Sequence, residues 1–205
     1  MSLSKNKIRY IQSLKDKKHR TANNVFVAEG NKMVSELLDC LKCQMLAGTR
    51  DFLNSVNLSH VEEIIEASDE ELEKASFMKT PQQTIAVFYQ PCYDSNAKFD
   101  TELVLALDGI QDPGNLGTIV RLADWYGIGH VFCSMDTADI YNPKVVQATM
   151  GALARVKVSY VGLYDFLLDH KDIPIYGTFL DGENMYAKEL TANGILVMGN
   201  EGNGI

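Results

Sequence analysis

The sequence lacks long apolar runs. None of its 205 residues belongs to a stretch near the roughly 20 apolar residues that a membrane-spanning helix needs. The lysines near the N-terminus have no apolar stretch behind them, so we expect no secretory signal. With 46% apolar residues, the chain has enough material for one large domain or two small ones outside the membrane.

Cysteine is scarce as well. The four cysteines are Cys40, Cys43, Cys92 and Cys133, and only the first two have the CxxC spacing of many metal ligands. A zinc site would need a second pair of ligands, and none lies nearby in the sequence. We therefore expect no metal, reduced and partly buried thiols, and a cytoplasmic protein.

The dinucleotide fingerprint GxGxxG is missing from both glycine-rich turns. The turn at 112–117 lacks this spacing, and the stretch 199–204 reads GxxGxG with no room for a following helix. The fingerprint works only between a strand and a helix, where it brings backbone amides to a pyrophosphate. A conventional dinucleotide-binding dehydrogenase is therefore disfavoured.

Basic residues are fewer than acidic ones over the whole chain, yet they are concentrated near the N-terminus. The formal net charge is −8, which argues against nucleic-acid binding by the whole surface. Residues 1–20 nevertheless hold seven of the nineteen basic residues. We predict that this segment binds the phosphates of a polyanion through Lys15, Lys17, Lys18 and Arg20. The alternative is an ordinary solvated helix face.

The first 90 or so residues read as a small α/β unit. Apolar spacing predicts helices over 5–18 and 31–40, a strand over 24–30, a strand or short helix followed by an acidic helix within 60–76, and a strand over 84–91. The polar stretch 92–100 has no clear periodicity and reads as a linker.

From Thr101 onward, strands alternate with helices. The expected strands are 103–107, 130–134, 156–160, 173–180 and 194–199; the expected helices are 115–126, 143–153, 163–169 and 185–190. This alternation predicts a parallel sheet covered on both faces, in which ligands bind beyond the carboxyl ends of the strands. The loops after Leu107, Ser134 and Met198 are therefore the informative ones.

The first of these loops opens the segment "DPGNLGTIVRLADWYG". Asn115 stands where an N-cap residue would stand, and Arg121 lies on the helix that follows. The planar guanidinium of arginine suits a phosphate or a carboxylate. The alternative is a plain cap with a surface ion pair between Arg121 and Asp124 or Asp108.

The other loops carry further signals. Asn142 before Pro143 predicts the start of a helix. After the last strand, "GNEGNGI" places polar residues between glycines, whose backbone amides can face a ligand.

Together, "LDGIQDPGNLGTIVRLADWYGI", "YNPKVVQATMGAL" and "ILVMGNEGNGI" resemble the signature segments of the SpoU (TrmH-like) family of RNA ribose 2'-O-methyltransferases. The N-terminal part resembles the L30e-type RNA-binding domain of rRNA-directed members. The resemblance implies an L30e-like domain over 1–95, a SPOUT domain with an α/β knot and a parallel sheet over 101–205, a homodimer, and S-adenosylmethionine as methyl donor. It assigns catalysis to Asn115, Arg121 and Glu201, and cofactor binding to Gly199, Asn200 and Gly202.

One family feature has no counterpart. The family's third motif, which forms the knot and much of the cofactor pocket, is not matched before Ile205. We therefore expect a truncated domain in which 199–205 pack poorly and the cofactor binds weakly. The expected function is 2'-O-methylation of ribosomal RNA; the alternatives are a tRNA methyltransferase and a non-catalytic RNA-binding protein.

Overall fold

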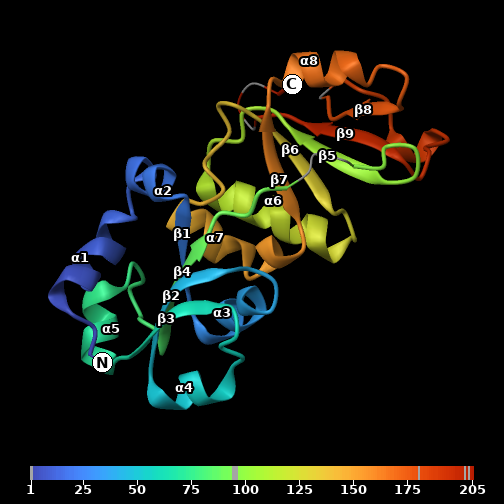
Figure 1. Cartoon of the computed structure of the whole chain (residues 1–205). Coiled ribbons are helices and arrows are strands. Elements are labelled where there is room, and N and C mark those ends of the chain that lie inside the picture. Colours follow the sequence, from blue (N-terminus) through green and yellow to red (C-terminus); the bar gives the residue numbers. More distant parts are fainter. Residues whose placement is uncertain (1, 94–96, 180, 201, 203) are drawn as a thin grey trace. The chain divides into compact units, whose positions relative to one another are not determined.

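The protein is described by a computed structural model that covers residues 2–93, 97–179, 181–200, 202 and 204–205. The chain divides into two compact units (Figure 1). Unit 1 comprises residues 1–92 together with 139–154, and unit 2 comprises residues 93–138 and 155–205. Within the described residues, no helix has the length and hydrophobicity needed to cross a bilayer.

Unit 1 is built on a mixed sheet of four strands in the order β1-β4-β2-β3. Strand β4 is antiparallel to β1 and β2, and β2 is parallel to β3. The strands are β1 (Val25–Glu29), β2 (Cys43–Gly48), β3 (Val61–Glu66) and β4 (Thr84–Tyr89). The helices are α1 (Lys5–Ser13), α2 (Lys17–Asn23), α3 (Asn31–Leu38), α4 (Arg50–Ser55), α5 (Asp69–Ala75) and α7 (Pro143–Thr149), with a 3-10 turn η1 (Ala152–Ala154).

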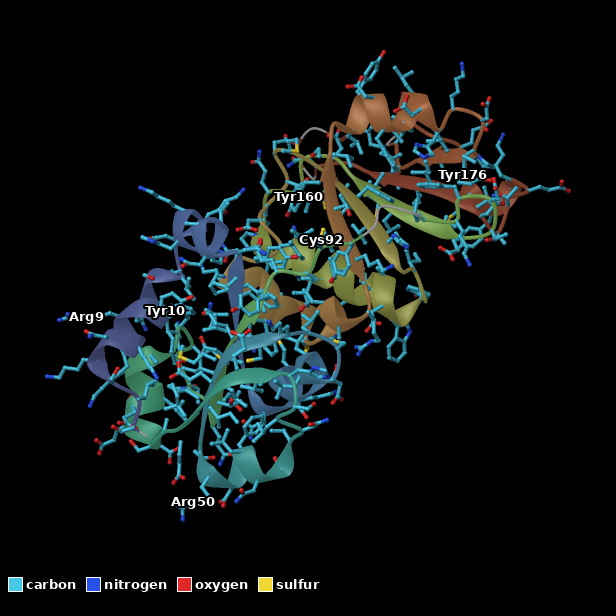
Figure 2. The ribbon with its side chains drawn as sticks, in the orientation of Figure 1. Arg9, Tyr10, Arg50, Cys92, Tyr160 and Tyr176 are labelled. Atoms are coloured by element: carbon cyan, nitrogen blue, oxygen red, sulfur yellow. The ribbon has the colours of Figure 1, made fainter. Side chains whose placement is uncertain are left out.

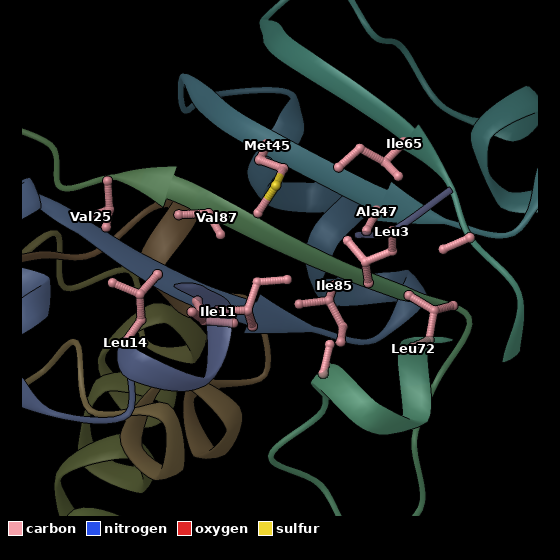
Figure 3. Close-up of a cluster of buried hydrophobic side chains, with 13 residues drawn as sticks. Leu3, Ile11, Leu14, Val25, Met45, Ala47, Ile65, Leu72, Ile85 and Val87 are labelled. Atoms are coloured by element: carbon pink, nitrogen blue, oxygen red, sulfur yellow. The ribbon is translucent and has the colours of Figure 1, made fainter. Parts of the chain in front are cut away.

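One core of unit 1 joins one face of this sheet to α1 and α5. Because side chains alternate along a strand, Val25 and Val27 face this core while Phe26 points to the opposite face. Figure 3 shows Ile11 and Leu14 near β1, and Leu72 of α5 beside Ile85 of β4. All of these apolar side chains are nearly inaccessible to solvent.

The opposite face of the sheet is covered by α3 and α7. Phe26 stacks on Phe88 of β4 and on Tyr141, with ring centroids 5.7 and 5.1 Å apart. Helix α7 therefore packs on β1, even though the two elements lie far apart in the sequence.

Several elements of unit 1 differ from the sequence expectation. The helix predicted over 5–18 is two helices, because the chain turns after Leu14 and restarts at Lys17. The helix predicted over 143–153 ends at Thr149. Met150 and Gly151 have φ of 50° and 94°, which is a left-handed turn that stops a helix.

Unit 2 contains a five-stranded sheet in the order β7-β6-β5-β9-β8, with every pair parallel. The elements are β5 (Leu103–Leu107), α6 (Pro113–Trp125), β6 (His130–Ser134), β7 (Lys157–Val161), α8 (Leu163–Asp169), β8 (Ile175–Gly177), a 3-10 turn η2 (Met185–Ala187) and β9 (Gly194–Met198). The predicted parallel α/β sheet is confirmed, while the knot stays a prediction.

Helices α6 and α8 lie on opposite sides of this sheet (Figure 1). Val104 and Phe132 face α8, where Phe132 and Phe166 have ring centroids 4.4 Å apart. Helix α6 turns the buried side chains of Leu116 and Val120 toward the sheet. Packing on both faces leaves the carboxyl ends of the strands as the place where loops can form a site.

Candidate functional site

Three loops meet at the carboxyl ends of β5, β6 and β9. The amide of Asp108 donates to the carbonyl of Met198 at 2.9 Å, which continues the pairing of β5 with β9. The amide of Gly109 donates to Ser134 Oγ at 2.8 Å, which ties β5 to the end of β6. The loops after Leu107, Ser134 and Met198 are therefore brought together, as the alternating pattern predicted.

Asp112 begins helix α6. Its Oδ1 accepts a hydrogen bond from the Asn115 amide at 2.8 Å, and Pro113 follows at the first helical position. The prediction that Asn115 is the N-cap is therefore wrong, because Asp112 already occupies that place. Asn115 lies within the first turn of α6 and lines a cavity.

This cavity has a volume of about 460 Å³ and lies between the start of α6 and the loop after β9. Its walls combine apolar side chains with polar groups and glycine backbone, from Ile110, Gln111, Asp112, Asn115, Thr118, Ile119, Met198, Gly199, Asn200 and Gly202. The volume is in the range of small-molecule sites. Gly199, Asn200 and Gly202, which the resemblance assigns to the cofactor, all line it.

Asn200 organises the loop after β9. Its Nδ2 donates to the carbonyl of Gly109 at 2.7 Å, and its Oδ1 accepts from the Gly202 amide at 2.8 Å. Its backbone forms a pair of hydrogen bonds with Gly204 at 3.0 and 2.9 Å. The expectation that 199–205 pack poorly therefore fails for Asn200, which holds the cavity wall in place.

Arg121 lies one turn beyond Thr118 on α6, and its side chain is exposed. Within the described part of the chain, it makes no ion pair or side-chain hydrogen bond. Asp124, the partner considered for it, instead accepts two hydrogen bonds of 2.8 Å from Arg155. The alternative in which Arg121 pairs with Asp124 is therefore excluded. Glu201, the third predicted catalytic residue, lies outside the described residues.

Arg20 is not available to RNA. Its side chain is 2% exposed, and Nη1 donates to the carbonyls of Leu14 and Lys15 at 2.8 and 2.6 Å. Its Nη2 forms an ion pair with Asp139 at 2.6 Å. The prediction of an RNA contact at Arg20 is therefore wrong, because the guanidinium is enclosed in unit 1.

Lys15, Lys17 and Lys18 are exposed beside this buried arginine, so their predicted contact with phosphates stays a prediction. Figure 2 shows Arg9, another basic residue of this segment, projecting from α1. A basic surface therefore exists at the N-terminal helices, without Arg20.

The four cysteines are free thiols. None of the four is in a disulfide, and among the described residues no group of three metal-ligating side chains lies close together. Burial raises the pKa of Cys133 to about 12 at the end of β6, so its thiol stays protonated near neutral pH.

Sequence reasoning missed two parts of the site. Asp112 could have been found from the Asp-Pro pair, which is typical of a helix start. Ser134 was noted only as a strand end, yet its Oγ donates to Asp136 at 2.6 Å and contacts Thr137 at 3.0 Å. Such a network depends on which loops meet in space.

The fold and the site define a protein with two α/β units, one of which has a parallel sheet with a cavity at its strand ends. Residues 102–205 match the SpoU rRNA Methylase family, and residues 5–86 match the MRM3-like substrate binding domain. The chain belongs to the SpoU rRNA methylase family.

Known relatives span both units. The chain is 30% identical over 210 residues, covering 100% of itself and 83% of the relative, to the 23S rRNA (guanosine(2553)-2'-O)-methyltransferase RlmP of Bacillus subtilis. An RNA methyltransferase of the TrmH family from Porphyromonas gingivalis has a similar structure, with a TM-score of 0.91, 42% identity, and coverage of 99% of this chain and 83% of that one. An AdoMet-bound rRNA methyltransferase from Sinorhizobium meliloti superposes with a TM-score of 0.88 at 27% identity, over 100% and 82% of the two chains.

Proposed function

We propose that this protein transfers a methyl group from S-adenosylmethionine to a ribose 2'-hydroxyl of ribosomal RNA. The observation that carries the proposal is the cavity at the ends of β5 and β9, with Arg121 exposed one helical turn away. Family membership and the rRNA substrates named for its relatives support the same conclusion. The resemblance also supports a homodimer.

The residues of the cavity fit this cofactor. Ile110, Ile119 and Met198 give apolar surface to a flat adenine, and the Asp112 carboxylate suits the positive charge of a sulfonium or an ammonium group. None of the described lining residues is basic. When bound, S-adenosylmethionine supplies a methyl group activated by its positively charged sulfur.

Arg121 is assigned to the RNA. Its guanidinium is exposed and makes no ion pair with the described residues, so both of its outer nitrogens can bind a phosphate. Holding the phosphate beside the reacting ribose would orient the 2'-hydroxyl toward the cavity. The fork of donors would also stabilise negative charge that develops on this oxygen.

The reaction must remove the proton of a weakly acidic hydroxyl. Arginine keeps its own proton under ordinary conditions, so we assign Arg121 an electrostatic role and not that of a base. We propose that the bound phosphate assists removal of the proton. A group can act as general base only if it lies within hydrogen-bond reach of the proton, and a phosphate held beside the ribose would meet this condition.

The test replaces Arg121 in the full-length protein and measures transfer of labelled methyl groups to ribosomal RNA. Arg121→Ala should lower the rate by about 100-fold or more, because a positioned charge is removed. Binding of S-adenosylmethionine, measured by calorimetry, should be retained. Arg155→Ala is the matched control, since its guanidinium is already paired with Asp124.

Two results would change the proposal. Near-normal transfer by Arg121→Ala would make this arginine a surface residue without a role in the reaction. RNA binding without any transfer by the unaltered protein would favour the non-catalytic RNA-binding alternative, and preferential modification of transfer RNA would replace the substrate.

A further inference from the structure

A second cavity lies in unit 1, and the proposed reaction does not use it. It has a volume of about 400 Å³ and is formed by β1, residues 77–79 and α7. Its apolar wall includes Val27 and Phe77, and its polar groups include Glu29, Lys79, Lys144 and Gln147. The cavity therefore combines apolar surface with one carboxylate and two ammonium groups, which could bind a ligand that has both polar and apolar parts.

Glu29 is a buried carboxylate with acceptor positions to spare. It is 5% exposed, and it accepts hydrogen bonds from the hydroxyl of Ser76 and, at 2.8 Å, from the amide of Phe77. Burial raises the pKa of Glu29, against the two hydrogen bonds, which lower it. A carboxylate offers about four acceptor positions, so about two remain.

The two lysines at the cavity are not neutralised by the protein. Lys79 and Lys144 are exposed, and neither forms an ion pair among the residues that the structure describes. Gln147 likewise makes no side-chain hydrogen bond with the described residues. The cavity therefore presents unused donors at its rim and a carboxylate deeper in its wall.

We propose that this cavity holds one unpaired nucleotide of the RNA substrate, with guanosine preferred. Guanine presents two adjacent N–H donors on its Watson–Crick edge, which match the two remaining acceptor positions of Glu29. The base lies against Val27 and Phe77, and the phosphate binds Lys79 and Lys144.

RNA is favoured over a free nucleotide by the rest of unit 1. The exposed Lys15, Lys17 and Lys18 belong to the same unit, and residues 5–86 match a substrate-binding domain. The assignment to RNA rests on the proposed function, but the binding of a nucleotide does not. A cavity that reads one base would let this unit select the RNA independently of methyl transfer.

The first experiment measures binding of guanosine, inosine and uridine 5'-monophosphates to the full-length protein by NMR titration. Guanosine monophosphate should bind about tenfold more tightly than uridine monophosphate, since a good pair of base contacts discriminates by about this factor. Inosine monophosphate lacks the exocyclic amino group and should fall between them. Equal affinities for all three would overturn the proposal.

Variants locate the binding. Lys79→Ala with Lys144→Ala should weaken guanosine monophosphate binding by about tenfold, because two charged contacts are lost. Lys98→Ala with Lys171→Ala removes the same charge away from the cavity and should have no effect. Glu29→Gln should abolish the preference for guanosine, provided that its melting curve shows a folded protein; no effect of the lysine pair would overturn the site.

A final experiment tells whether the cavity binds a nucleotide of an RNA chain or only a free nucleotide. A short single-stranded RNA with one guanosine among uridines should displace guanosine monophosphate, whereas an all-uridine RNA should not. Failure of the guanosine RNA to displace it would overturn the assignment to RNA. Because these readouts measure binding alone, absent methyl transfer would count against the proposed function and leave this site unaffected.

Discussion

In unit 1 the most buried charge, Arg20, is enclosed by two carbonyls and a carboxylate, whereas in unit 2 polar side chains line a cavity at the strand ends. The first arrangement leaves the guanidinium no room for a ligand. The second leaves Arg121 exposed and keeps the loops together through Asn200. The comparison teaches that a basic residue must be judged by its partners, because sequence alone shows only its charge.

The largest effect should come from breaking the buried pair of unit 1. Asp139→Ala leaves Nη2 of Arg20 without its carboxylate, and we expect the free energy of unfolding to fall by about 3–5 kcal/mol. Urea denaturation measures this loss. Glu66→Ala removes the partner of Arg50 in an exposed pair and should cost only about 0–1 kcal/mol. Equal losses would show that burial of Arg20 does not matter.

A smaller loss should follow from cutting the hydrogen bonds of unit 2. Asn200→Ala removes the bonds to Gly109 and Gly202, at about 1 kcal/mol each, and should also weaken S-adenosylmethionine binding. Asn193→Ala is the matched control, because its side chain donates to the carbonyl of Phe99 away from the cavity. Calorimetry should find cofactor binding unchanged in the control; equal weakening in both would contradict a local role.

The smallest effect compares one buried thiol in each unit. Burial raises the pKa of Cys43 and of Cys133 to about 12 from an ordinary value of 9.0. The folded protein then keeps both thiols protonated while the unfolded chain ionises, so stability is complete below pH 9.0 and is lost as the pH rises toward about 12.

Urea denaturation between pH 8 and 9 checks this dependence, and the expected loss over this range is on the order of tenths of a kcal/mol for each thiol. Cys43→Ala and Cys133→Ala should each reduce the alkaline loss, and Cys92→Ala, at an exposed thiol, should leave it unchanged. An unaltered pH dependence in both buried variants would show that the protonation of these thiols does not differ between the folded and the unfolded protein.

Much of the fold could be predicted from the sequence because apolar spacing is a local signal. The strands of unit 2 and the start of α7 at Asn142 and Pro143 follow this signal. Strand β2 was not recognised, since five of its six residues are buried and no alternation marks it. The break after Leu14 also escaped notice, because Arg20 stabilises it from a distance.

The candidate site was predictable in outline only. The loops follow from the carboxyl ends of parallel strands, so their meeting could be inferred. The Asp-Pro pair marks the cap at Asp112, but the burial of Arg20 could not be told from the exposure of the neighbouring lysines, because all of them are basic residues of one segment. Which of these basic residues is buried depends on contacts between segments that are distant in the sequence, such as the ion pair of Arg20 with Asp139.

The packing of residues 139–154 with unit 1 has a consequence for the design of protein fragments. The match to the methylase family runs continuously over 102–205, yet α7 inside that range covers β1. The boundary of the family match and the boundary of the compact unit therefore differ at α7. A fragment of unit 1 that ends at the family boundary lacks Tyr141, so Phe26 loses the ring that stacks on it. A fragment that also contains residues 139–154 keeps this face of the sheet covered.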